Sequence, residues 1–123
     1  MHSLSLDQRS DVLRQTADAL VRRDGPELTT RQLGIFITCY LMDDVLTVRD
    51  LCLKLNASRP AITRALDRLS ELDLVCRKTD QLDRRRILIR RTTAGARLLL
   101  NIEHILADAA KVAREPSSPP VSG

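Results

Sequence analysis

The side chains best suited to chemistry in this chain are arginines, and most of them lie in one stretch. Residues 58–97 contain eleven Lys and Arg against five Asp and Glu, a net charge of +6, whereas residues 1–50 contain six Arg against eight acids. A guanidinium can bind a phosphate through two parallel N–H donors, while an ammonium acts as a point charge. This cluster therefore indicates a polyanionic partner. Scattered, solvated surface charge is the alternative that composition alone leaves open.

The first candidate residues follow Ser58 at helical spacing. Apolar residues recur every three or four positions at Ile62, Leu66, Leu69 and Leu72, which predicts an amphipathic helix that Ser58 caps. Its polar face carries Arg59, Thr63, Arg64 and Arg68. We expect Arg59, Thr63 and Arg64 to lie near base edges in a major groove. We expect Arg68 and the Ser58 hydroxyl to lie near phosphates. An ordinary helix with a solvated arginine face is the alternative.

The second candidate residues lie between two basic, β-branched segments, 75–78 and 86–91. They are Asp83, Arg84, Arg85 and Arg86. The pattern predicts a β-hairpin with a charged tip, and an arginine there can enter the negative minor groove of A·T-rich DNA. Asp83 is expected to hold the guanidinium, and a solvated charged turn is the alternative. A helix-turn-helix followed directly by such a hairpin is a more specific indication of DNA binding than either part alone.

The sequence lacks the residue patterns of metal sites, catalytic sites and platforms that bind single-stranded nucleic acid. Cys39, Cys52 and Cys76 form no C-x-x-C pair and the chain has only two His, so we expect no metal and no cofactor. Catalytic Ser/His/Asp sets and glycine-rich phosphate loops are also missing, so we expect no enzyme. One Phe, one Tyr and no Trp give no stacking platform for single strands, which leaves duplex DNA. The thiols are expected to be buried and structural, and Cys76, beside two basic residues, is the one to test as a sensor.

The sequence also predicts where the protein works. Its first ten residues lack the basic and apolar regions of a signal peptide, and the longest near-apolar run, 33–42, is half a membrane span. Three widely spaced cysteines fit a reducing compartment. We therefore expect a cytoplasmic, nucleoid-associated protein without membrane contact.

Helices must position these residues. Periodicity and capping residues predict helices over 6–23, 31–42 (capped by Thr29 or Thr30), 48–55 (capped by Thr47), the helix after Ser58, and 93–114 (capped by Thr93). The second helix is expected to bury Leu33, Phe36, Ile37, Tyr40 and Leu41, and the third Leu51 and Leu55. The fold class expected is mainly α with a small β-hairpin wing: a winged helix-turn-helix flanked by N- and C-terminal dimerisation helices.

From Leu28 to Gly95 the chain resembles the MarR family of winged helix-turn-helix transcriptional regulators. Leu28-Thr29-Thr30-Arg31-Gln32 is similar to the family's L-T-x-x-Q, and residues 58–69 and 74–77 resemble its recognition helix and the following segment. Its wing signature is matched by Asp83, Arg85, Thr92 and Gly95. The resemblance implies that Arg85 is the minor-groove arginine and Asp83 its partner. It also implies a dimer built from the terminal helices and a pocket for a small molecule or oxidant.

Three positions depart from the family pattern. Asp73 stands where the family has a helix-ending Gly, and we expect it to adopt the left-handed conformation. Arg91 replaces an apolar Leu, so the base of the wing is expected to pack differently. A proline-rich tail replaces a further dimerisation helix, which leaves the dimer interface smaller.

Together these observations predict four segments. They are an N-terminal dimerisation helix (1–27), a winged helix-turn-helix DNA-binding domain (28–92), a C-terminal dimerisation helix (93–115) and a disordered tail (116–123). The function expected is a sequence-specific double-stranded DNA-binding regulator, a homodimeric repressor on an inverted repeat, with no small-molecule effector indicated by the residues themselves. The alternatives are a winged-helix protein–protein interaction module and a non-specific architectural DNA binder.

Overall fold

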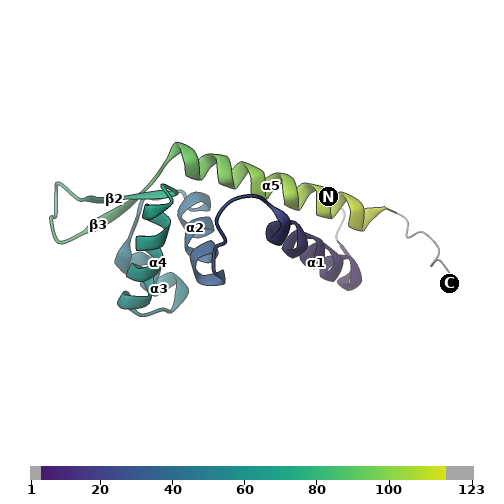
Figure 1. Cartoon of the computed structure of the whole chain (residues 1–123). Helices are drawn as coiled ribbons and strands as arrows, with labels where there is room; N and C mark the ends of the chain where they lie inside the picture. Colours follow the sequence, from purple (N-terminus) through teal and green to yellow (C-terminus); the bar gives the residue numbers. More distant parts are fainter. Residues whose placement is uncertain (1–3, 116–123) are drawn as a thin grey trace. The chain divides into compact units, whose positions relative to one another are not determined.

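The computed structural model describes residues 4–115, so the predicted tail at 116–123 lies outside the described residues. The elements in chain order are α1 (Leu6–Arg22), α2 (Thr30–Leu41), β1 (Leu46–Thr47), α3 (Val48–Leu55), α4 (Arg59–Glu71), β2 (Val75–Thr79), β3 (Ile87–Arg91) and α5 (Thr93–Arg114) (Figure 1). They form two compact units: a central unit, residues 26–100, and a terminal unit, residues 4–25 with 101–115. The predicted fold class, mainly α with a hairpin wing, is confirmed.

The helix starts follow local capping chemistry. The side-chain oxygens of the residues before α1, α2, α3 and α4 each accept the backbone N–H three residues on: Ser5, Thr29, Thr47 and Ser58. The predicted cap of α5 is wrong by one residue. Thr92, not Thr93, accepts the N–H of Gly95 at 2.9 Å.

The core of the central unit joins α2, α3, α4 and β2. Its largest fully buried side chains are Phe36, Ile35, Leu51, Ile62, Leu66, Leu69 and Val75. The predicted stripe of α2 is partly wrong, because Ile35 and Cys39 are buried while Leu41 is 61% exposed. Nearly every position from 33 to 41 is apolar, so periodicity could not identify which face would meet α4. Leu55, predicted to face inward, is 37% exposed at the last residue of α3.

The three strands form an antiparallel sheet in the order β1-β3-β2. The hairpin β2–β3 is the predicted wing, whereas the two-residue strand β1 was not predicted. Thr47 of β1 pairs with Leu88 of β3, and its side chain also caps α3. One buried threonine thereby places the start of α3 beside the base of the wing.

A hydrogen-bond cluster holds the start of α5 against the turn between α4 and β2. The Tyr40 hydroxyl donates to the Leu74 carbonyl at 2.6 Å and accepts the Thr92 N–H at 3.0 Å. The Thr92 hydroxyl donates to the Asp73 carbonyl at 2.6 Å. A Cβ at Gly95 would overlap both the Tyr40 hydroxyl and the Leu74 carbonyl. Glycine is therefore needed at this position for the close approach of α5.

The structure explains the two positions of the central unit that depart from the family pattern, Asp73 and Arg91. Asp73 has a φ of 58°, so the predicted left-handed conformation is confirmed. The Arg91 guanidinium donates to the Cys39 carbonyl (3.1 Å) and the Met42 carbonyl (2.6 Å), and it lies 5.7 Å from the centre of the Tyr40 ring. Arg91 thus binds carbonyls at the C-terminus of α2, where a cation is electrostatically favoured.

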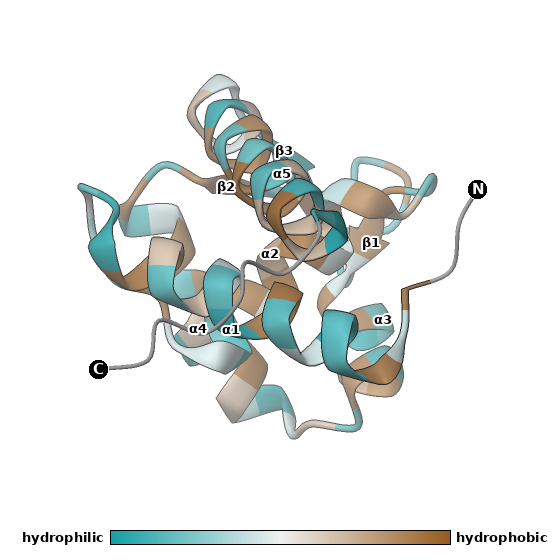
Figure 2. Ribbon diagram, turned by 90° about the vertical axis from the view of Figure 1, so that its right-hand side faces the viewer, coloured by the Kyte–Doolittle hydropathy of each residue, from teal (hydrophilic) through white to brown (hydrophobic). Residues whose placement is uncertain are grey.

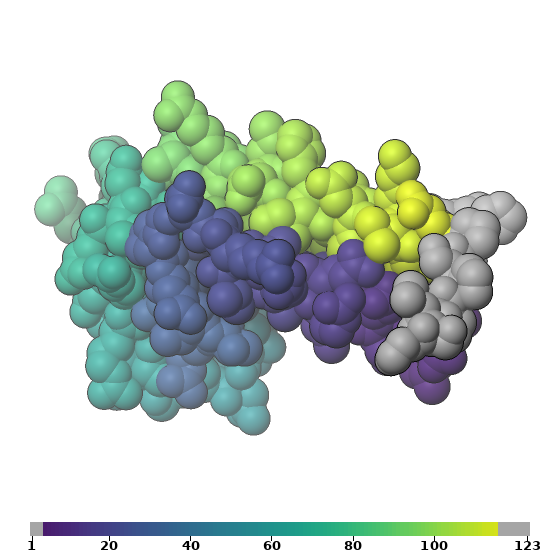
Figure 3. Space-filling model, turned by 45° about the vertical axis from the view of Figure 1, so that its right-hand side comes forward, coloured from purple at the N-terminus to yellow at the C-terminus, as the bar shows by residue number. Residues whose placement is uncertain are grey.

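The terminal unit contains α1 and the last part of α5, which lie side by side (Figure 3). The Gln8 amide donates to the Ala113 carbonyl at 3.2 Å. Apolar and polar residues alternate around both helices (Figure 2). Several large apolar side chains remain exposed: Leu6, Leu13, Val21, Leu106 and Val112. Over residues 4–115, no helix combines the length and apolar character that crossing a membrane requires.

Candidate nucleic-acid interface

The helix α4 presents a basic face to solvent and an apolar face to the core. Pro60 occupies its first turn, where the missing N–H costs nothing, and the Ser58 hydroxyl accepts the Ala61 N–H at 3.3 Å. The predicted arginines Arg59, Arg64 and Arg68 are exposed, and Thr63 is half-buried. Arg68 pairs with Glu71 one turn on, at 3.4 Å. The helix-turn-helix and its polar face are thus arranged as the periodicity predicted.

An ion pair ties α4 to the wing. The Asp67 carboxylate lies 2.7 Å from the Arg77 guanidinium of β2, and both side chains are partly exposed. The pair joins the helix to the strand that follows it, so it restrains the orientation of the wing relative to α4. This ion pair was not predicted from the sequence, because the helical pattern places Asp67 on the polar face of α4 and does not show that β2 lies beside it.

The wing tip is ordered by its acids. The Asp83 carboxylate accepts the Arg85 backbone N–H (3.1 Å) and its side-chain Nε–H (3.2 Å), and the side-chain hydrogen bond is the main reason that the pKa of Asp83 is lowered. Arg86 lies 3.6 Å from Asp80. Arg84 is exposed, and the Arg85 side chain is 91% exposed. Asp83 thereby orients a guanidinium that extends into solvent.

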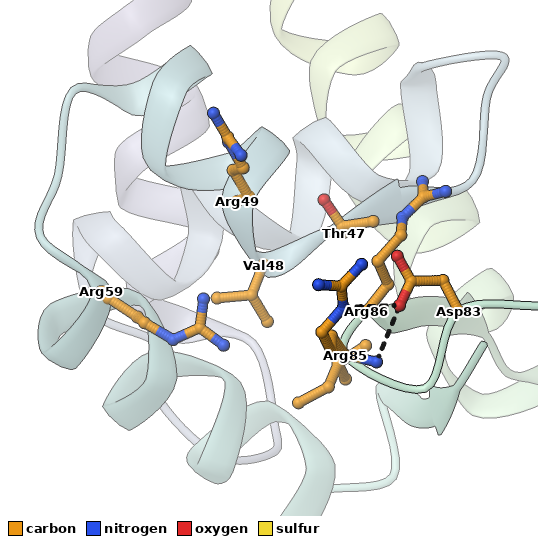
Figure 4. Close-up of a pocket in the computed structure, with 8 residues that line it drawn as sticks. Thr47, Val48, Arg49, Arg59, Asp83, Arg85 and Arg86 are labelled. Atoms are coloured by element: carbon orange, nitrogen blue, oxygen red, sulfur yellow. Dashed lines mark hydrogen bonds and ion pairs between the residues drawn. The ribbon is translucent and has the colours of Figure 1, made fainter.

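A pocket of about 440 Å³ lies between α3, the start of α4 and the wing (Figure 4). Its lining residues are Thr47, Val48, Arg49, Arg59, Asp83, Arg85, Arg86 and Ile87. Arg59 and Arg85 extend toward it from opposite sides. Sequence reasoning did not single out Arg49, because only the pairing of β1 with β3 brings α3 beside the wing.

The three cysteines are free thiols that differ in burial. Burial raises the pKa of the Cys39 thiol to about 11, against the smaller opposing effect of Arg91. The Cys39 thiol is therefore protonated at neutral pH. The other two cysteines, Cys52 and Cys76, are half-buried. Among residues 4–115, no three His, Cys, Asp or Glu side chains are grouped as a metal site would require.

The fold and this site define a winged helix-turn-helix protein. Residues 27–86 match the model of the MarR family, and the chain belongs to that family, as its motifs had suggested. No curated protein sequence matches the chain.

Solved structures share the fold at low sequence identity. A mutant of S. aureus MepR is 22% identical with a TM-score of 0.70, covering 89% of this chain and 82% of that one. The crystal structure of an S. aureus MepR–DNA complex is 22% identical with a TM-score of 0.67, covering 86% and 82%. YusO of Bacillus subtilis is 22% identical with a TM-score of 0.59, covering 86% and 67%. At these identities the likeness establishes the fold.

Proposed function

We propose that this protein is a transcriptional regulator that binds duplex DNA, with α4 in a major groove and the β2–β3 wing in the adjacent minor groove. The observation that carries the proposal is the exposed arginine face of α4 beside a wing whose Arg85 is oriented by Asp83. Membership of the MarR family and the existence of a MepR–DNA complex support it. The protein acts by binding, without a cofactor and without catalysis.

Within the DNA-binding segment, 28–92, the residues divide by what they contact. Thr63 and Arg64 lie in the first two turns of α4, where side chains reach base edges. Arg68 and the Ser58 hydroxyl bind phosphates, and Arg85 enters the minor groove with Asp83 as its partner. The adjacent Arg84 and Arg86 add positive charge at the wing.

We further propose that the protein is a homodimeric repressor that binds an inverted repeat. The exposed apolar side chains of α1 and α5, Leu6, Leu13 and Val21 with Leu106 and Val112, supply the surface for dimerisation through segments 1–27 and 93–115. A dimer places its two α4 helices about 34 Å apart, one turn of DNA. Sedimentation that shows a monomer at high micromolar concentration would contradict the dimer.

The test compares two arginines of α4 on two duplexes, one selected from random sequence and one scrambled. Arg64→Ala should cost about 1–3 kcal/mol on the selected duplex and flatten the preference at one or two positions. Arg68→Ala should weaken both duplexes alike and lower the log–log salt slope by about one. Equal losses from both variants on both duplexes would replace sequence-specific regulation with architectural binding. If the affinity of the wild-type protein for duplex DNA does not depend on salt, the DNA-binding proposal fails. A winged-helix protein–protein interaction module would then be the remaining interpretation.

A further inference from the structure

The arginine pocket between α3, α4 and the wing combines Asp83 and Arg85 of the family's wing signature with Arg49, which no family motif includes. Four of its lining residues are Arg49, Arg59, Arg85 and Arg86, and the only acid among the lining residues is Asp83, so the lining has a net charge of +3. The four arginines come from α3, from α4 and from the turn between β2 and β3. Bringing like charges together has an electrostatic cost, which a bound anion offsets.

The acids around the pocket are already engaged. Asp83 accepts two N–H groups of Arg85, and Asp80 lies 3.6 Å from Arg86. The Asp50 carboxylate, at the start of α3, accepts the Thr47 N–H at 2.8 Å. Within residues 4–115, neither Arg49 nor Arg59 forms an ion pair. These two guanidiniums are therefore available to an anion from outside the protein.

The location of the pocket indicates which anion. If α4 occupies a major groove and the wing the adjacent minor groove, the sugar–phosphate strand that separates the grooves must cross between α4 and the wing. The pocket lies in that interval, with Arg59 at the start of α4 on one side and Arg85 and Arg86 on the other (Figure 4). This step rests on the proposed function.

We propose that the pocket binds one backbone phosphodiester of the duplex, with Arg59 and, after rotation of its exposed side chain, Arg49 as its ligands. Arg85, whose side chain is 91% exposed, extends past the phosphate into the minor groove. The volume of about 440 Å³ accommodates a phosphate with bound waters, since one water takes about 30 Å³ in the liquid. Arg59 then contacts the backbone and does not read bases, and Arg49 becomes a DNA contact that no sequence motif indicated.

The first experiment measures affinity and salt dependence for Arg49→Gln and Arg59→Gln on a selected and a scrambled duplex. Arg97→Gln is the matched control, because it removes one exposed charge from α5 outside the pocket. Each pocket variant should weaken both duplexes by the same factor, about tenfold, and lower the salt slope by about 0.9 per protomer. A loss confined to the selected duplex for Arg59→Gln would make it a base reader. Arg49→Gln binding like Arg97→Gln would remove it from the interface. Either result would overturn the proposal.

The second experiment identifies the phosphate. Neutral methylphosphonates replace single phosphates along the duplex, and one position should abolish the effects of Arg49→Gln and of Arg59→Gln together. Separate positions for the two variants, or competition by inorganic phosphate at constant ionic strength with no sensitive position in the DNA, would overturn the shared phosphodiester site. If Arg64→Ala still loses sequence preference while both pocket variants bind normally, this inference fails and the proposed function stands.

Discussion

Replacing Gly95 with alanine places two physical effects in opposition. In helix α5, alanine is favoured over glycine by up to about 1 kcal/mol, so helix propensity alone predicts a more stable protein. The added Cβ, however, would overlap the Tyr40 hydroxyl and the Leu74 carbonyl. Relieving that overlap displaces Tyr40 from its hydrogen bonds to the Leu74 carbonyl (2.6 Å) and the Thr92 N–H (3.0 Å). The two bonds are worth about 1 kcal/mol each, and overpacking adds about 1–3 kcal/mol.

We therefore expect Gly95→Ala to lower the free energy of unfolding by about 2–4 kcal/mol, a fall in Tm of about 8–16 °C by calorimetry. Gly34→Ala is the matched control: a Cβ there meets open space in α2, so stability should rise by about 0.5–1 kcal/mol. In a Tyr40→Phe background the penalty of Gly95→Ala should shrink, because one of the two overlapping groups is gone. A Gly95→Ala protein as stable as wild type would refute the reasoning.

Three further substitutions test the central unit. Asp73→Gly should raise Tm by about 2–4 °C, because it relieves a left-handed residue (φ 58°) and keeps the backbone hydrogen bonds; a clear fall in Tm would contradict this. Arg91→Leu should destabilise the fold by about 1–2 kcal/mol in urea unfolding, since two carbonyls at the end of α2 lose their donor, and an unchanged midpoint would show that water replaces the guanidinium. Hydrogen bonds from Thr47 lower the pKa of Asp50, so the stability that it contributes is present above about pH 4 and is lost as the pH falls through the lowered pKa. In Asp50→Asn, the free energy of unfolding should therefore fall less as the pH is lowered below about 4. If the loss of stability at low pH is the same as in the wild type, other carboxylates cause it.

The wing and the caps of α2, α3 and α4 could be predicted because the interactions that form them lie within a few residues. Ser58 caps α4 through an N–H three residues on, Pro60 is tolerated in the first turn, and Asp83 holds Arg85 two residues away. Apolar spacing likewise predicted the polar face of α4. Interactions between residues so close in the chain can be predicted from the local sequence.

The parts that sequence reasoning missed depend on contacts between distant segments. A two-residue strand leaves no periodic pattern, yet β1 pairs Thr47 with Leu88 and so brings Arg49 to the wing. The buried face of α2 was misassigned because its apolar residues surround the helix, and only packing selects Ile35 and Cys39 over Leu41.

The sequence by itself therefore determined the order of the helices and the wing, the caps of α2, α3 and α4, and the basic character of α4 and the wing. Tertiary structure alone decided which arginines share a pocket. The physical reason is that local hydrogen bonds and apolar periodicity act over a few residues, whereas the pocket exists only once β1, from a distant part of the chain, has paired with β3.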